Sequence, residues 1–161
     1  MKVKVADTAS ARQGCFAIRR AVFIEEQGIP EAEEWDDCDA TAVHFLGCVD
    51  GRPAATARLL VAGETAKIGR VAVVAEHRGT GLGLSLMEHV VTHARRAGFR
   101  SAMLDAQTYA IGFYERLGFV AEGPEFDDGS GILHRRMRRE FAGMDRGGET
   151  DRPESDMSAP R

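Results

Sequence analysis

The stretch from Ala66 to Ala94 constrains the fold more than any other part of this chain. Ala66 to Val74 is rich in β-branched residues and predicts a strand. The strand leads into Arg78-Gly79-Thr80-Gly81-Leu82-Gly83, after which apolar residues recur at helical spacing, namely Leu84, Met87, Val90, Val91 and Ala94. Gly98 stands where glycines commonly end helices. The stretch therefore predicts a strand, a glycine turn and a helix in direct succession.

A glycine turn in this position favours a phosphate group, because its backbone N–H groups converge and the helix adds partial positive charge. A Walker A loop would need Lys and then Ser or Thr after the last glycine, whereas Leu84 and Ser85 follow Gly83, so that interpretation fails. A dinucleotide fingerprint needs GxGxxG, and this turn has GxGxG. A tight turn that binds nothing stays open on these six residues alone.

The remaining patterns predict an α/β (α+β) fold with a mixed, mostly antiparallel central sheet and helices on both faces. Two hairpin turns are predicted before the glycine turn, at Asp50-Gly51 and Gly63-Glu64, and strands alternate with helices after it. The predicted strands are 3–5, 42–49, 54–60, 66–74, 101–106, a strand beginning at 119–120, and 132–137. The predicted helices are one that is capped by Ser10 and ends near Gly28, one that starts at 84, and one at 111–117. An acidic loop is expected at 31–39.

The composition is that of a globular domain, with 43% hydrophobic and 29% charged residues among 161. No apolar run approaches the about 20 residues of a membrane span, and no secretory signal begins the sequence. We therefore expect a cytoplasmic protein without a membrane partner. Residues 143–161 are polar and are expected to form a disordered tail after a domain at 1–142.

Charge and cysteine content exclude several classes. A net charge of -4 gives no reason to expect nucleic-acid binding. Cys15, Cys38 and Cys48 are an odd number without a CxxC pair, which argues against a disulfide framework. His89 and His93 could face one metal from a helix, but no ligand cluster accompanies them, so no metal is expected.

Two linked motifs resemble those of the GNAT N-acetyltransferase superfamily. Arg78, Gly81 and Gly83 fit its Arg/Gln-x-x-Gly-x-Gly/Ala signature, and the segment 112–119, Gly-Phe-Tyr-Glu-Arg-Leu-Gly-Phe, resembles its FYxxxGF segment. Further segments look like the ElaA-like branch: 23–30, Asp36 and Asp39 before His44, Arg58-Leu59, 70–73, Ala106-Gln107 and 131–134. The resemblance covers nearly all of residues 1–139.

The resemblance implies a GNAT fold whose splayed strand pair admits acetyl-CoA as co-substrate, with no metal. The acyl group would lie beside the backbone of Val71, Ala72 and Val73, and the diphosphate over Arg78, Gly79, Thr80, Gly81, Leu82 and Gly83. Gln107 would offer an amide where many members carry asparagine. Tyr114 is the candidate acid for the departing thiolate, with a packed aromatic as the alternative.

The residues leave the base and the acceptor open. Chemically able bases are Glu25, Glu26, His44, Asp105 and His134, or water. The acceptor would be a small-molecule or protein amine near 25–34, and the acidic residues of 31–37 either attract a cation or form a solvated loop. A non-catalytic acyl-CoA sensor that uses Arg135–Arg139 as a partner surface is the rival function. A homodimer is left open.

Overall fold

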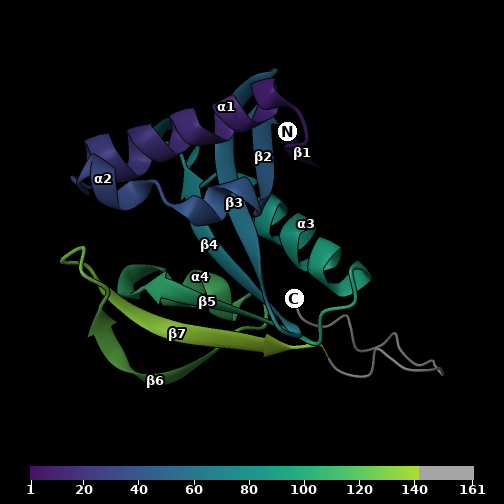
Figure 1. Ribbon diagram of the computed structural model, residues 1–161, viewed down its shortest axis with the longest axis vertical. Helices are drawn as coiled ribbons and strands as arrows, with labels where there is room; N and C mark the ends of the chain where they lie inside the picture. Colours follow the sequence, from purple (N-terminus) through teal and green to yellow (C-terminus); the bar gives the residue numbers. More distant parts are fainter. Residues whose placement is uncertain (142–161) are drawn as a thin grey trace. The chain divides into compact units, whose positions relative to one another are not determined.

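The computed structural model describes residues 1–141 (Figure 1), so the predicted tail at 143–161 lies outside the described residues. Hydrogen bonding connects the strands in the order β1-β2-β3-β4-β5-β7-β6. The pairs β1–β2, β2–β3, β5–β7 and β6–β7 are antiparallel, and β4–β5 is parallel. The prediction of a mixed, mostly antiparallel sheet is confirmed.

The strands are β1 (Lys2–Val5), β2 (Val43–Val49), β3 (Arg52–Ala62), β4 (Thr65–Val73), β5 (Ser101–Gln107), β6 (Val120–Asp127) and β7 (Leu133–Glu140). The helices are α1 (Ala9–Arg19), the π-helical η1 (Arg20–Glu26), α2 (Glu31–Glu34), α3 (Leu82–Arg96) and α4 (Ile111–Glu115), with short 3-10 turns η2 (Asp37–Ala40), η3 (Ala75–His77) and η4 (Thr108–Ala110). None of the helices within residues 1–141 is long and apolar enough to cross a membrane.

The chain divides into two compact units, of which the first holds Met1–Val61 and Ile68–His93. In this unit β2 has two buried faces. Leu46 packs in a cluster with Cys15 and Ile18 of α1, whereas the ring of Phe45 meets His93 of α3 edge to face at a centroid distance of 5.2 Å. Because neighbouring strand residues point to opposite faces, α1 and α3 cover opposite faces of the sheet here (Figure 1).

The second unit holds Ala62–Lys67 and the chain from Ala94 onward. Its β7 lies between β5 and β6, and the register gives these strands two different faces. On one face the side chains are small or apolar and buried, as at Leu104 and Met137. Arg139 points to this same face and donates to the carbonyl oxygen of Leu117 just after α4, so α4 covers it. The other face is polar.

The structure corrects two local predictions near the start of the chain. The helix begins at Ala9, and its N-cap is Thr8, whose hydroxyl accepts from the N–H of Ala11 at 3.1 Å; the predicted cap Ser10 lies inside the first turn. The predicted acidic loop at 31–39 is instead a short helix followed by a 3-10 turn. The predicted hairpin turns are confirmed, with positive φ at Asp50, Gly51 and Gly63.

Candidate functional site

The glycine turn lies in the first unit, between η3 and α3. Gly79 and Gly81 both have positive φ, at 77° and 91°, which favours glycine at each position. A Cβ added to either residue would meet no heavy atom within 4 Å, so the space above both glycines is open. Thr80 steadies the turn by donating its hydroxyl to the carbonyl oxygen of His77 at 2.6 Å. The turn is thus a fixed backbone arch with room beside it.

The helix that follows is anchored so that its N-terminus faces this arch. Leu82, Leu86 and Val90 are fully buried, which holds α3 against the sheet. The N–H of Ser85 makes a helical bond to the carbonyl oxygen of Gly81 at 3.0 Å, and the amides before it have no acceptor within the helix. Those amides and the positive end of the helix dipole suit a diphosphate.

Arg78 opens the turn, and its guanidinium is engaged with a carboxylate in the same unit. Its two terminal nitrogens donate to the two carboxylate oxygens of Glu26 at 2.6 and 2.7 Å, and its Nε donates to the carbonyl oxygen of Val73 at 2.9 Å. The hydrogen bonds from Arg78 lower the pKa of Glu26. Arg78 and Glu26 are separated by 52 positions, so no local sequence signal could reveal this pair.

Before the turn, β4 contains a backbone distortion. Arg70 has a φ of 52°, in the left-handed region, and Gly69 precedes it. The parallel β4–β5 ladder has three residue pairs, Thr65–Lys67 with Ser101–Met103, although β4 runs on to Val73 and β5 to Gln107. Val71 and Val73 are half-buried and Ala72 is buried. The ladder is thus confined to the part of β4 that belongs to the second unit.

A cluster of paired charges, which we name the arginine–carboxylate cluster, surrounds Arg70 in the first unit. Its members are Arg19, Arg58 and Arg70 with Glu34, Asp36 and Asp39. Arg19 and Glu34 are only 1% and 2% exposed, and their side chains are 2.8 Å apart. Arg58 donates to Asp36 at 2.7 and 2.9 Å and to Asp39 at 2.9 Å. Arg19 also stacks on the ring of Trp35.

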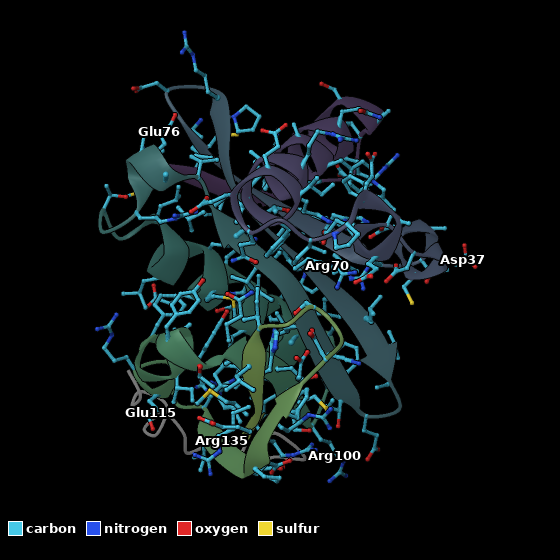
Figure 2. All side chains as sticks on the ribbon, turned by 90° about the vertical axis from the view of Figure 1, so that its left-hand side faces the viewer. Asp37, Arg70, Glu76, Arg100, Glu115 and Arg135 are labelled. Atoms are coloured by element: carbon cyan, nitrogen blue, oxygen red, sulfur yellow. The ribbon has the colours of Figure 1, made fainter. Side chains whose placement is uncertain are left out.

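For Glu34 and Asp36 this cluster corrects both interpretations of the acidic segment, whereas Glu31, Glu33 and Asp37 are exposed. Glu34 and Asp36 are neither free to attract a cation nor merely solvated, because arginines from α1, β3 and β4 neutralise them. Hydrogen bonds from Arg58 lower the pKa of Asp36 to about 2. Figure 2 shows Arg70 beside this segment and Asp37 at its outer end, where the side chain is exposed. The segment is therefore fastened to the sheet by charge pairing.

The predicted bases of the first unit differ in availability. Glu25 is exposed, and Glu26 is paired with Arg78. His44 is 2% exposed, and its Nε2 donates to the carbonyl oxygen of Asp39 at 2.9 Å because a carbonyl can only accept. Its Nδ1 is sealed from solvent without a hydrogen-bond partner. His44 thus packs inside this unit, with Nδ1 closed off from bulk solvent.

Two predicted bases lie on the polar face of the second unit. Asp105 accepts from Nε of Arg136 at 2.7 Å, so its charge is already paired. His134 is buried, and its Nδ1 lies 2.7 Å from the carbonyl oxygen of Ile132. Its Nε2 lies 3.5 Å from a carboxylate oxygen of Asp128. His134 therefore has both ring nitrogens in defined surroundings.

Tyr114 and Gln107 also belong to the second unit. Tyr114 is buried in α4, and its ring meets those of Phe113 and Phe119 edge to face, so the packing alternative holds for the ring. Burial raises the pKa of its hydroxyl, which keeps the proton in place at neutral pH. Gln107 ends β5 opposite His134 and precedes η4, but its side chain does not cap that turn.

The basic strand β7 offers no row of unengaged arginines for a partner. Arg135 donates to the carbonyl oxygen of Gly123, and Arg136 and Arg138 pair with Asp105 and Glu122. The predicted partner surface of the rival sensor function is thus occupied by contacts within the unit. Within residues 1–141 no group of three or more His, Cys, Asp and Glu side chains is placed to hold a metal ion.

Comparison with known families agrees with this geometry. The sequence model of the acetyltransferase (GNAT) family matches residues 12–119, which is more than half of the chain. The chain is a member of the GNAT acetyltransferase family. It is therefore an N-acetyltransferase by family, on a fold whose members use acyl-CoA.

Individual relatives have similar length and fold. The chain is 34% identical over 145 residues to the Bacillus subtilis protein YyaT, covering 88% of this chain and 97% of that protein. It is 30% identical over 141 residues to the N-acetyltransferase YjcF of the same organism, covering 87% and 100%. An acyl-CoA N-acyltransferase from Pseudomonas aeruginosa superposes with a TM-score of 0.75 at 32% identity, covering 86% and 97%. Escherichia coli ElaA superposes with a TM-score of 0.77 at 26% identity, covering 86% and 99%, as the ElaA-like motifs predicted.

Proposed function

We propose that this protein transfers an acetyl group from acetyl-CoA directly to a primary amine in the cytoplasm. The observation that carries the proposal is the open arch at Gly79 and Gly81 in front of the N-terminus of α3. An anchored helix of this length, preceded by two glycines at positive φ with free space above them, would suit a diphosphate. Membership in the GNAT family supports acyl-CoA as the molecule that supplies it.

The residues present fit such a group. The amides of the arch and of Leu82 and Gly83 would hold the diphosphate, and Thr80 keeps the arch in shape through its bond to His77. Arg78 would add a positive charge by exchanging Glu26 for the diphosphate, since both are anions with paired oxygens. The backbone of Val71, Ala72 and Val73 would hold the acyl arm, with the N–H of Val73 as donor to the carbonyl oxygen.

Acetyl-CoA, when bound, supplies the activated acyl group as a thioester. The chain has to provide an uncharged amine and a proton for the leaving sulfur. We assign the second task to Tyr114, whose hydroxyl carries a proton at neutral pH; burial raises its pKa, so it would act first as a hydrogen-bond donor to the sulfur. The arginine–carboxylate cluster is internally neutralised, so recognition of a cationic acceptor is not assigned to it.

Calorimetric titration of acetyl-CoA into the full chain tests the proposal, with Gly81→Glu as the disrupting variant and Gly98→Glu as its control. The two glycines flank α3, have φ of 91° and 94°, and have no atom within 4 Å of an added Cβ. Both variants therefore carry the same backbone strain, of about 1–2 kcal/mol. We expect Gly81→Glu to weaken binding at least about tenfold through blockage and charge repulsion, and Gly98→Glu to bind normally.

Two results would contradict the proposal. Absence of binding by the natural protein would remove acetyl-CoA as co-substrate. Equal weakening in both variants would show that strain, and not the arch, controls affinity.

A further inference from the structure

Arg70 has a backbone conformation that its residue type disfavours. Among residues 1–141, only Asp50 and Arg70 have a positive φ without being glycine, at 51° and 52°. Asp50 lies in the hairpin turn after β2, where a short polar residue tolerates this conformation. Arg70 lies inside β4, directly after Gly69, whose φ is not positive. The residue type that adopts this conformation freely stands one position too early, so something other than local preference holds Arg70.

The side chain of Arg70 is fastened to the end of α2, beside which it lies in Figure 2. Its Nη2 donates to the carbonyl oxygen of Glu34 at 2.9 Å and to a carboxylate oxygen of Asp36 at 3.4 Å. Its Nε lies 3.1 Å from Oε2 of Glu34 but outside the direction of a hydrogen bond, so this contact is one of charge. Because a guanidinium is planar and always charged, these contacts fix its position and its direction.

Glu34 is anchored independently of Arg70. It is 2% exposed, and Arg19 donates to both its carboxylate and its carbonyl oxygen, at 2.8 and 3.0 Å. The same carbonyl oxygen therefore receives Arg19 from α1 and Arg70 from β4, which uses both of its lone pairs. All of these residues belong to the first unit. The strain at Arg70 is thus opposed by contacts to a residue that α1 already holds.

The residues that follow Arg70 are also held in place. Ala72 is buried in the apolar cluster that β4 shares with α1. The N–H of Val74 donates to the carbonyl oxygen of Ala54 in β3 at 2.9 Å. The segment 71–73 is therefore tied to β3 at its end and, through Arg70, to α2 at its start.

We infer that Arg70 is a positioning residue for acyl-CoA, which acts through the backbone of residues 71–73, and that Glu34 holds it in place. This inference rests on the proposed function, in which that backbone binds the acyl arm. The φ of one residue sets the direction of the peptide groups after it, so a change from 52° to an extended value would turn the N–H groups of 71–73. Without a fastened side chain, a residue with a Cβ is disfavoured in this conformation by a factor of about 5–30.

Calorimetric titration of the full chain with acetyl-CoA compares two replacements of this side chain. Arg70→Ala removes the fastening but keeps a Cβ, so we expect the affinity to fall about 5- to 30-fold as the competent backbone becomes a minor state. Arg70→Gly removes the fastening and the Cβ together. Because glycine adopts both signs of φ about equally, its loss of affinity should stay within about two- to threefold.

The glycine variant separates positioning from other roles. A guanidinium that only contributes charge, or that touches acetyl-CoA itself, would be missed equally in Arg70→Ala and Arg70→Gly. Equal losses of affinity, a larger loss in Arg70→Gly, or natural affinity in Arg70→Ala would each overturn the inference.

Asp50 provides a matched control for backbone strain, because it has nearly the same φ in the same unit. Asp50→Ala should lower the free energy of unfolding, as Arg70→Ala does, and leave the affinity for acetyl-CoA unchanged. A similar loss of affinity in Asp50→Ala would assign the effect of Arg70→Ala to general destabilisation and contradict the inference.

The role of Glu34 is tested by Glu34→Gln, alone and combined with Arg70→Gly. If Glu34 acts through the backbone at position 70, Glu34→Gln should weaken acetyl-CoA binding severalfold by itself and have no further effect in the Arg70→Gly background. Losses that multiply in the double variant would show an independent effect and refute the role given to Glu34.

The last measurement needs no ligand. Amide ¹H–¹⁵N chemical shifts of residues 71–73 in the full chain report the direction of this backbone. We expect Arg70→Ala to change them and Arg70→Gly to leave them near their natural values. Unchanged shifts in Arg70→Ala would overturn the inference whether or not the protein binds acetyl-CoA. If the shifts behave as expected but the natural protein does not bind acetyl-CoA, the proposed function is contradicted, while the control of this backbone by Arg70 is supported.

Discussion

Replacement of Arg19 by Met should destabilise the protein far more than the same replacement of its neighbour Arg20. Arg19 is 1% exposed and makes four hydrogen bonds at 2.7–3.1 Å, to the side chains of Glu34 and Asp39 and to the carbonyl oxygen of Glu34. Arg20 makes an ion pair with Glu31 in which the side chains are 44% and 55% exposed. The two variants thus remove the same charge from neighbouring positions in different environments.

The expected magnitude follows from what each variant leaves behind. Arg19→Met leaves the buried Glu34 with Arg70 as its remaining ion-pair partner, and removal of one partner from a buried pair costs about 3–5 kcal/mol. Arg70 and Arg58 still contact Glu34 and Asp39, which places the loss near the lower limit, at about 3 kcal/mol. The exposed pair of Arg20 contributes about 0–1 kcal/mol. At roughly 2–4 °C per kcal/mol, Arg19→Met should lower Tm by roughly 6–12 °C.

Urea unfolding followed by circular dichroism at pH 7 measures this difference as the free energy of unfolding, with equal slopes confirming a common unfolded state. The double variant Arg19→Met with Glu34→Gln provides a second measurement, because it also removes the buried carboxylate charge that Arg19 had paired. It should recover part of the loss seen in Arg19→Met alone. If Arg19→Met lowers the free energy of unfolding by an amount within about 0.5 kcal/mol of that for Arg20→Met, the conclusion that the arginine–carboxylate cluster holds residues 31–39 against the sheet is refuted.

Three further predictions concern single side chains. Glu26→Gln should tighten acetyl-CoA binding about two- to fivefold in calorimetry, because it releases Arg78 from a half-exposed ion pair. Weaker binding would contradict the proposal that Arg78 exchanges Glu26 for the diphosphate. Asp36 has a pKa of about 2 in the folded state, below its ordinary 3.8, so its contribution to stability is present above about pH 3.8 and lost as pH falls toward 2. The free energies of unfolding of Asp36→Asn and the natural protein should therefore converge between pH 3.8 and 2. A difference that stays constant over that range would contradict the prediction. Tyr114→Phe should lower kcat about 10²-fold without changing the affinity for acetyl-CoA. The control Tyr109→Phe, at an 80% exposed position, should change neither quantity. Equal kcat values for the two variants would show that Tyr114 has only a packing role.

The parts of the fold that depend on neighbouring residues could be predicted from the sequence. Asp50-Gly51 favours a tight hairpin turn, and the structure places both residues at positive φ. The glycine turn and the apolar spacing after it predicted α3, which the structure confirms over Leu82–Arg96. In each case the determining residues lie within one or two turns of the element that they specify.

The charge pairs of the candidate site could not be predicted in this way. Arg19 meets partners 15 and 20 positions away, and Arg70 meets the carbonyl oxygen of Glu34 across 36 positions. Whether an acidic residue is solvated or buried depends on which strand passes beside it, and periodicity does not contain that information. The left-handed backbone of Arg70 also gave no signal, since that conformation is ordinarily occupied by glycine, which here stands one residue earlier.

The pairing of the carboxylates in residues 34–39 bears on where an amine would be recognised. Glu34, Asp36 and Asp39 are each bound by guanidinium groups that remain charged at any physiological pH, so this set presents little net charge to a ligand. The carboxylates of Glu34, Asp36 and Asp39 instead hold residues 34–39 against α1, β3 and β4. Recognition of a protonated amine should therefore not depend on these three residues, whose loss would first be seen in the free energy of unfolding.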